Sequence, residues 1–194
     1  FAILALVAVC ANFFVAPASA FQNRYLDEVR GFSASQIAVF TLVTATPAGI
    51  GLVVGGKLAD IKGRRRLIAT AIPFATALVL LSFMVAGPPM WFAAFGGGFV
   101  GGIAYPALAV YRAELFPTGN RGRAAGLLTA AALLGGIGGL QLVGRLLDRG
   151  LSYGGVIGLV ALGQIVVVAV VLWRFPETAH RSLEELNPED LITT

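Results

Sequence analysis

Six long apolar stretches, separated by short polar segments, set the pattern of this sequence. Each stretch has close to the 20 or so apolar residues that a helix needs to cross the hydrocarbon core of a bilayer. To within a few positions they cover residues 2–21, 35–55, 67–87, 90–111, 124–144 and 154–173. The pattern predicts an all-α, polytopic membrane protein, with six transmembrane helices in one domain at residues 1–173 and a polar tail at residues 174–194.

The composition agrees with lipid as the main solvent and excludes several classes of protein. Hydrophobic residues make up 57% of the chain and charged residues 12%, whereas an ordinary globular domain has about 25% charged residues. The net charge of +4 comes from cations at the ends of apolar stretches, so we expect no nucleic-acid partner. Cys10 and His180 are the single cysteine and the single histidine, and we therefore expect no metal and no cofactor.

The distribution of Lys and Arg predicts how the spans are oriented. The turns after the second and fourth stretches and the tail carry ten of these residues, whereas the turns after the first and fifth stretches carry four. Basic residues collect in cytoplasmic loops. The even-numbered turns and the C-terminus are therefore predicted to face the cytoplasm, as is the N-terminal edge of the chain.

A short internal repeat relates the two halves of the chain. Residues 56–60 read GKLAD after the second stretch, and residues 144–148 read GRLLD after the fifth. Three spans reverse the direction of the chain, so the two copies would lie on opposite faces of the membrane, as in an inverted three-plus-three repeat. The alternative is that glycine, aspartate and basic residues are simply common at helix ends.

Residues 55–66 read GGKLADIKGRRR, and we expect a short charged turn there. Residues 56–65 resemble the cytoplasmic loop signature of the major facilitator superfamily, with one departure, because Ile61 stands where a basic residue is usual. The resemblance implies that this cluster latches one conformation of a transporter. The residues it assigns to the latch are Gly56, Asp60, Gly63, Arg64 and Arg65. Gly56 is also expected to let two helix backbones approach closely. The alternative is a plain basic cluster that only sets topology.

Two further motifs resemble sugar-porter-like members of the same superfamily. Residues 111–117 read YRAELFP and lead to Arg121 and Arg123. These two arginines and the Arg64–Arg66 group are the expected partners of Glu114 at the end of the fourth span. The alternative for Glu114 is an acid bathed in interfacial water. Residues 175–178 read FPET and resemble the segment after the last span of those members.

The FPET motif decides which part of a transporter this chain resembles. It implies spans seven to twelve of a twelve-helix transporter, so we expect a missing N-terminal half with six more spans. The sequence begins at Phe1 inside an apolar stretch, which fits that expectation. The other partners implied are the lipid bilayer and a small-molecule solute, with or without a coupling proton.

No apolar stretch has a charged residue near its middle, so a proton-coupling group would lie in the missing half. The candidates for contact with the solute are Asn12, Tyr105 and Gln141. For Gln141 and Gln164 the alternative is a hydrogen bond between helices. Threonines inside spans are expected to bond to their own backbone.

Transport of a small solute by alternating access is the function these features favour, as part of a secondary active transporter or a uniporter. A non-transporting sensor or scaffold on the same fold is the alternative. We do not expect an enzyme, because the spans lack an acid or a histidine that could serve a nucleophile. The excess of Arg over Lys, with abundant Ala and Gly, favours a bacterial plasma membrane.

Overall fold

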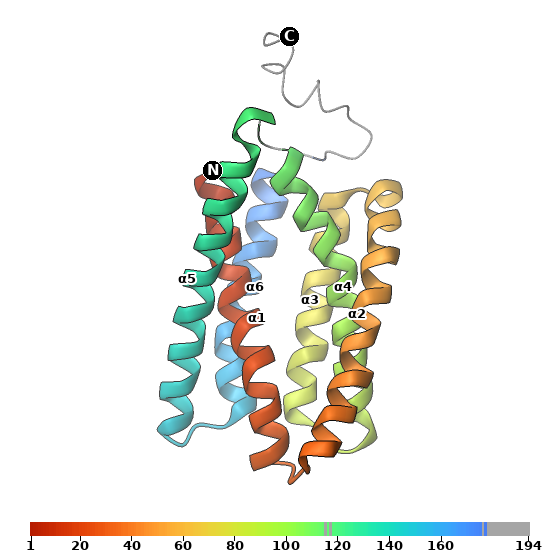
Figure 1. Cartoon of the computed structure of the whole chain (residues 1–194), viewed down its shortest axis with the longest axis vertical. Helices are drawn as coiled ribbons and strands as arrows, with labels where there is room; N and C mark the ends of the chain where they lie inside the picture. The colour runs from red at the N-terminus through yellow and green to blue at the C-terminus, as the bar shows by residue number, and fades with distance from the viewer. Residues whose placement is uncertain (115, 117, 176, 178–194) are drawn as a thin grey trace.

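Six long helices form a bundle in the computed structural model (Figure 1). The structure describes residues 1–114, 116, 118–175 and 177, without the side chains of residues 112–114 and 118. The helices are α1 (Ala2–Glu28), α2 (Ala34–Lys62), α3 (Arg64–Met84), α4 (Pro88–Glu114), α5 (Arg121–Asp148) and α6 (Tyr153–Arg174), with a short 3-10 helix, η1 (Thr118–Asn120), before α5. All six are long and apolar enough to cross a membrane. The fold is therefore all-α, and the chain is a multi-pass membrane protein.

The helices do not stop where the apolar stretches stop. Each helix extends beyond its predicted span at one end or both; α3 begins three residues earlier than predicted and also ends three residues earlier. The charged segment 55–66, which was predicted as a turn, is helical except at Gly63. That prediction is wrong because hydropathy marks the lipid boundary rather than the helix boundary. Lys and Arg are good helix formers, and their long side chains reach water from a helix that has left the hydrocarbon.

The bundle has two ends that carry different connections (Figure 1). We call the end with the N-terminus, the α2–α3 junction, the α4–α5 link and the end of α6 the basic end. The opposite end, which carries the α1–α2, α3–α4 and α5–α6 links, is called the far end. A separate cluster of buried apolar side chains stabilises each end.

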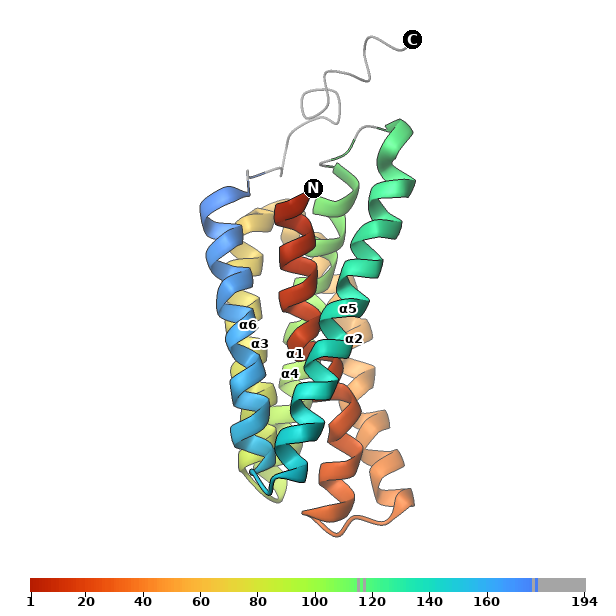
Figure 2. The ribbon, with the colours of Figure 1, turned by 90° about the vertical axis from the view of Figure 1, so that its left-hand side faces the viewer.

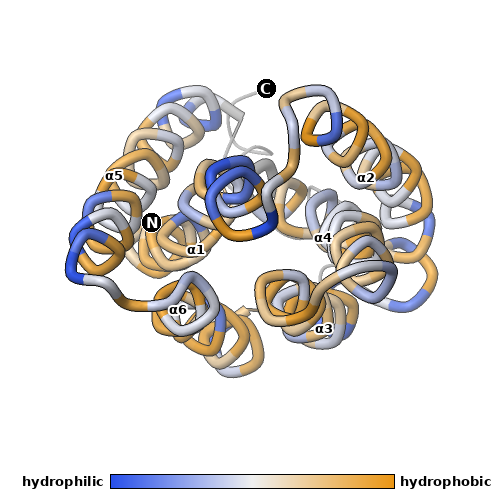
Figure 3. The backbone as a smooth tube through the Cα atoms, turned by 90° about the horizontal axis from the view of Figure 1, so that it is seen from below, coloured by the Kyte–Doolittle hydropathy of each residue, from blue (hydrophilic) through white to orange (hydrophobic). Residues whose placement is uncertain are grey.

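Seen from the side and along its axis, the bundle has three rows of two helices (Figures 2 and 3). The helices α3 and α6 form one outer row, α1 and α4 the middle row, and α2 and α5 the other outer row. The most extensive contacts are those of α2 with α4, α1 with α5, and α3 with α4. Exchanging the first three helices with the last three converts the α2–α4 pair into the α5–α1 pair. This exchange symmetry is what the predicted inverted repeat requires.

Glycines bring the paired helices into backbone contact. A Cβ atom at any of four glycines would meet a main-chain carbonyl oxygen of the opposite helix, so only glycine fits there. The contacts are Gly51 with Phe99 and Gly55 with Ile103 between α2 and α4, and Gly135 with Val9 and Gly139 with Phe13 between α5 and α1. Close packing of glycine against main chain therefore occurs in both symmetry-related helix pairs.

Candidate functional site

The α2–α3 junction at the basic end consists of a single residue. Helix α2 ends at Lys62, α3 begins at Arg64, and Gly63 between them has φ 90° and ψ 140°. Only glycine adopts this region of backbone conformation at little cost. The glycine of the loop signature is therefore required by the reversal of the chain between two helices.

A carboxylate from the C-terminal part of the chain caps the start of α3. The main-chain amide of Arg64 donates to Oε1 of Glu177 at 2.8 Å, and that of Arg65 donates to Oε2 at 3.2 Å. Glu177 thereby accepts from two of the amides that have no partner within a helix, at the end where the helix dipole favours an anion. A Cβ at Gly63 would lie 2.7 Å from Oε2 of Glu177, so the carboxylate also uses the space that glycine leaves.

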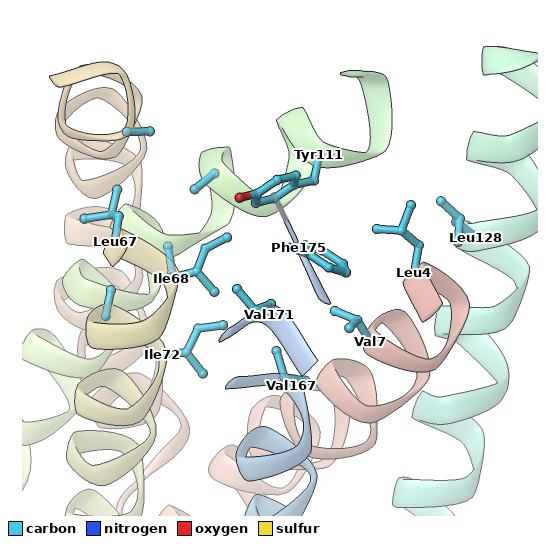
Figure 4. Packing of buried hydrophobic residues seen from close by; sticks show 14 residues of the cluster. Leu4, Val7, Leu67, Ile68, Ile72, Tyr111, Leu128, Val167, Val171 and Phe175 are labelled. Carbon is cyan, nitrogen blue, oxygen red and sulfur yellow. The ribbon is translucent and has the colours of Figure 1, made fainter. Parts of the chain in front are cut away.

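Phe175 holds Glu177 in place. Its side chain is buried between helices from both halves of the chain, in a cluster that includes Leu4, Val7 and Val171 (Figure 4). The ring of Tyr111 meets that of Phe175 edge to face, with centroids 4.9 Å apart. Such a contact adds about 1 kcal/mol to the free energy of burial. The FPET motif therefore combines an apolar anchor with a capping acid two residues later.

The arginines that follow Gly63 have separate partners. The guanidinium of Arg64 lies 3.5 Å from Oδ1 of Asp60, which is four residues earlier in the last turn of α2. The Asp60 side chain is 73% exposed, and an exposed pair of this kind stabilises by no more than about 1 kcal/mol. The guanidinium of Arg65 donates to the carbonyl oxygen of Leu172 near the end of α6. Together with the cap, this bond joins the start of α3 to the end of α6.

The remaining members of the predicted latch take little part in these contacts. A Cβ at Gly56 would meet nothing within 4 Å, so the close helix approach expected there occurs at Gly55 instead. Arg121 is half-buried, and its Nε has no hydrogen-bond acceptor among the described residues. Arg123 is exposed. The side chain of Glu114 lies outside the described residues, as does its predicted pairing with these arginines.

The structure does not bring the predicted solute-contact residues together. The amide of Asn12 donates to Ala8 of its own helix at 3.3 Å, Tyr105 on α4 is 60% exposed, and Gln141 on α5 is exposed. Within the described ranges no hydrogen bond joins any two of them. Gln164 is buried and donates to the Ala11 carbonyl at 3.0 Å, which is the hydrogen bond between helices weighed above.

Two of the three threonines in α2 bond to their own helix as predicted, whereas the hydroxyl of Thr41 donates to the side chain of Asn23 on α1 at 3.5 Å. Thr44 and Thr46 donate to the carbonyls of Phe40 and Leu42, four residues earlier. No group of three His, Cys, Asp or Glu side chains among the described residues is placed to hold a metal ion. The polar chemistry in the described part of the chain is therefore concentrated at the two ends of the bundle.

A second network, which the sequence did not indicate, lies at the far end. Tyr25 is buried, and its hydroxyl donates to the carbonyl of Phe83 at 3.0 Å. The guanidinium of Arg30 donates to the Tyr25 hydroxyl at 2.8 Å and to the carbonyl of Val85 at 2.5 Å. The carbonyls at the end of α3 lack partners within the helix, so Tyr25 and Arg30 satisfy them from α1 and the link that follows it.

The far-end network continues into α6. The hydroxyl of Tyr153 donates to Oε2 of Glu28 at 2.6 Å, and Arg24 pairs with Oε1 of the same carboxylate at 2.7 Å. The rings of Tyr25 and Tyr153 lie 5.5 Å apart. Aromatic and hydrogen-bonded contacts thus join the end of α1, the end of α3 and the start of α6. A tyrosine and two arginines just past the first apolar stretch were the only sequence signal for this network.

Comparisons with known proteins agree with this architecture. The family model described as Major Facilitator Superfamily matches residues 1–191. A probable actinorhodin transporter of Streptomyces coelicolor is 36% identical over 123 residues, which are 62% of this chain and 21% of that protein. The structure also resembles the inward-open xylose transporter XylE of E. coli, with a TM-score of 0.62 and 17% identity over 96% of this chain and 51% of the transporter.

This chain matches only part of the length of each relative. The chain spans about half of the xylose transporter and about a fifth of the actinorhodin transporter. At 17% identity the likeness to the xylose transporter shows the fold alone. The match of the family model over nearly the whole chain, on a six-helix bundle with the loop signature at its α2–α3 junction, places this protein in the major facilitator superfamily.

Proposed function

We propose that this chain forms one six-helix half of a transporter that moves a small solute across a membrane by alternating access. Family membership over residues 1–191 is the observation that carries the proposal. The exchange symmetry of the six helices supports it, because inverted repeats underlie alternating access in transporters of this kind. A second six-helix half, encoded upstream, would complete the solute path.

The basic end is the cytoplasmic end in this proposal. Residues 1–173 form the transmembrane domain, and residues 174–194 form a cytoplasmic tail in a bacterial plasma membrane. The bias of Lys and Arg toward this end supports the orientation. Cysteines introduced at Val29, Leu151 and Lys62 test it with an impermeant thiol reagent on intact cells. Val29 and Leu151, which are exposed at the far end, should react. Reaction at Lys62 alone would reverse the orientation.

The network around Gly63 is the proposed latch. Glu177 and Arg65 join the end of α6 to the start of α3, while Asp60 and Arg64 join the end of α2 to the start of α3. All these contacts are ionic or lie at helix ends near water, where a small displacement separates the partners at low cost. We propose that the latch is closed in one conformation of the transporter and open in another.

Solute flux is the decisive experiment. The full-length protein is reconstituted in vesicles and tested with actinorhodin, which the name of the Streptomyces relative suggests, and with xylose, which is the solute of the structural relative. A broader panel of small polar and amphipathic compounds follows. Flux that depends on the protein and saturates with solute is the expected result, and repeating it with and without a pH gradient tests proton coupling.

Two controls give the flux measurement its meaning. Vesicles without protein set the background, and a thermal unfolding curve of the reconstituted sample shows that the protein is folded. Absence of flux from the whole panel in a folded sample would contradict the proposal and favour a sensor or scaffold. Asn12→Ala, Tyr105→Phe and Gln141→Ala then ask which of the proposed contacts changes the KM for the solute.

A further inference from the structure

The cations at the α2–α3 junction fall into two groups. Arg64 and Arg65 face inward and contact Asp60 and Leu172. Lys62 and Arg66 are exposed, and among the described residues no carboxylate lies within ion-pair distance of either side chain. The nearby acids already have partners, because Asp60 faces Arg64 and Glu177 caps α3. Lys62 and Arg66 therefore present positive charge that nothing in the described chain neutralises.

These two cations line one pocket. It has a volume of about 410 Å³ and lies between the end of α2 and the start of α3, with Ile61, Leu67 and Thr70 as its other lining residues. The one-residue junction at Gly63 brings the two helix ends together, so Lys62 and Arg66 line the same pocket. Thr70 uses its hydroxyl on the carbonyls of Arg66 and Leu67. The pocket is thus a cationic concavity with an apolar edge.

Its position along the helices matches the headgroup layer of a membrane. Lys62 is the last residue of α2 and Arg66 the third of α3, both helices of membrane-spanning length. Ile61, at the edge of the pocket, is 73% exposed, and Phe74, about two turns deeper along α3 than Arg66, is 59% exposed. Charge above and exposed apolar side chains below are complementary to a phosphate group that carries acyl chains.

We propose that this pocket binds the headgroup of an anionic phospholipid of the phosphatidylglycerol class. Lys62 and Arg66 contact the phosphate through charge-assisted hydrogen bonds, while the acyl chains lie along Phe74, deeper on α3. The inference rests on the orientation proposed above, which places the pocket in the cytoplasmic leaflet. The headgroup chemistry would also suit a free phosphate compound, so the experiment has an arm for each.

Native mass spectrometry of the full-length protein in detergent measures the binding directly. The sample is titrated with phosphatidylglycerol and, separately, with phosphatidylcholine of the same acyl chains. We expect tighter binding of phosphatidylglycerol. The Lys62→Gln/Arg66→Gln variant should weaken it by about 30-fold, since each basic residue near an anionic lipid contributes about a factor of five. Binding of phosphatidylcholine should not change.

The matched control removes two cations from another junction. Arg145→Gln/Arg149→Gln neutralises two exposed arginines at the far end and should leave phosphatidylglycerol binding as in the wild type. An equal loss in both variants would show that only net charge matters and would overturn the proposal. So would a wild-type protein that binds the two lipids equally.

A second measurement does not depend on the variants being folded. A photoreactive phosphatidylglycerol is crosslinked to the wild-type protein, and the modified peptides are identified. Crosslinks within residues 61–74 support the proposal, whereas crosslinks confined to other segments overturn it. Millimolar inorganic phosphate or glycerol 3-phosphate is added in parallel. Loss of the crosslink at these concentrations would assign the pocket to a soluble anion instead of a lipid. The orientation has its own test by thiol labelling, so a failure of one proposal is distinguishable from a failure of the other.

Discussion

Both ends of α3 are held by side chains from other parts of the chain, but with opposite chemistry. At the basic end the carboxylate of Glu177 accepts from two main-chain amides. At the far end Tyr25 and Arg30 donate to main-chain carbonyls. A helix exposes donors at its start and acceptors at its end, so the sign of the partner follows from the direction of the helix.

The two ends also differ in how easily they separate. The far-end network is built around a buried tyrosine with aromatic neighbours, whereas the Asp60–Arg64 pair and the Glu177 cap at the basic end are ionic and partly exposed. Buried aromatic contacts are strong and do not depend on water, while exposed ionic contacts exchange readily with it. We therefore expect substitutions at the far end to affect stability most, and substitutions at the basic end to affect transport most.

Tyr25→Ala should have the largest effect on stability. It removes a buried ring and the donor to the Phe83 carbonyl, and truncation of a buried aromatic side chain costs about 3–5 kcal/mol. Tyr25→Phe is the control. It keeps the ring and should cost about 1–3 kcal/mol, because Arg30 and Phe83 each lose a hydrogen-bond partner. The free energy of unfolding in mixed micelles measures both. Equal effects of the two variants would mean that packing of the ring is unimportant.

Gly63→Ala and Gly150→Ala compare equivalent backbone positions at the two ends. Both glycines have positive φ, 90° and 84°, but a Cβ at Gly63 meets Glu177, whereas a Cβ at Gly150 meets nothing within 4 Å. Gly150→Ala should cost only the backbone strain, about 1–2 kcal/mol. Gly63→Ala should cost about 1 kcal/mol more, because the cap is displaced as well. Unfolding measurements that give equal costs would show that Glu177 does not occupy this position.

Glu177→Ala should cost about 1 kcal/mol of stability through loss of the cap and should slow transport more than it destabilises the fold. Glu177→Gln keeps an oxygen that can accept a hydrogen bond but removes the charge, so its stability loss should be less than about 1 kcal/mol. Flux and thermal unfolding are measured on the same samples. Unchanged flux in Glu177→Ala would remove this residue from the latch.

Asp60→Asn should have the smallest effect on stability, within about 1 kcal/mol, because the Asp60 side chain is 73% exposed. The latch predicts slower transport even so. Arg64→Ala should slow transport in the same way. If both variants transport at the wild-type rate and express normally, the charged junction serves topology only.

The sequence identified the six spans, because hydropathy over about 20 residues reports directly on contact with lipid. It also led to the family, since the spacing of Gly63 and its neighbours reflects a backbone requirement that is local. The charged turn predicted at residues 55–66 was wrong, because α2 continues as a helix beyond the apolar stretch. Hydropathy carries no information on helical structure there.

Contacts between distant segments could not be predicted. Glu177 caps an amide 113 residues earlier in the chain, and Tyr25 bonds to a carbonyl 58 residues later. The FPET motif drew attention to Glu177, but nothing in the sequence indicated that its partners are the main-chain amides of Arg64 and Arg65. The close helix approach expected at Gly56 occurs at Gly55, because a shift of one residue turns a side chain about 100° around the helix. Hydropathy does not resolve which of two adjacent glycines faces α4.

The single-residue junction at Gly63 has a mechanical consequence. Helices α2 and α3 lie in opposite outer rows of the bundle (Figure 2), and there is no slack in the chain between them. Glu177 is bonded to the amides of Arg64 and Arg65, and only Gly63 separates these from the last turn of α2. We therefore expect a displacement of Glu177 to be transmitted to the end of α2, because no flexible loop lies between them.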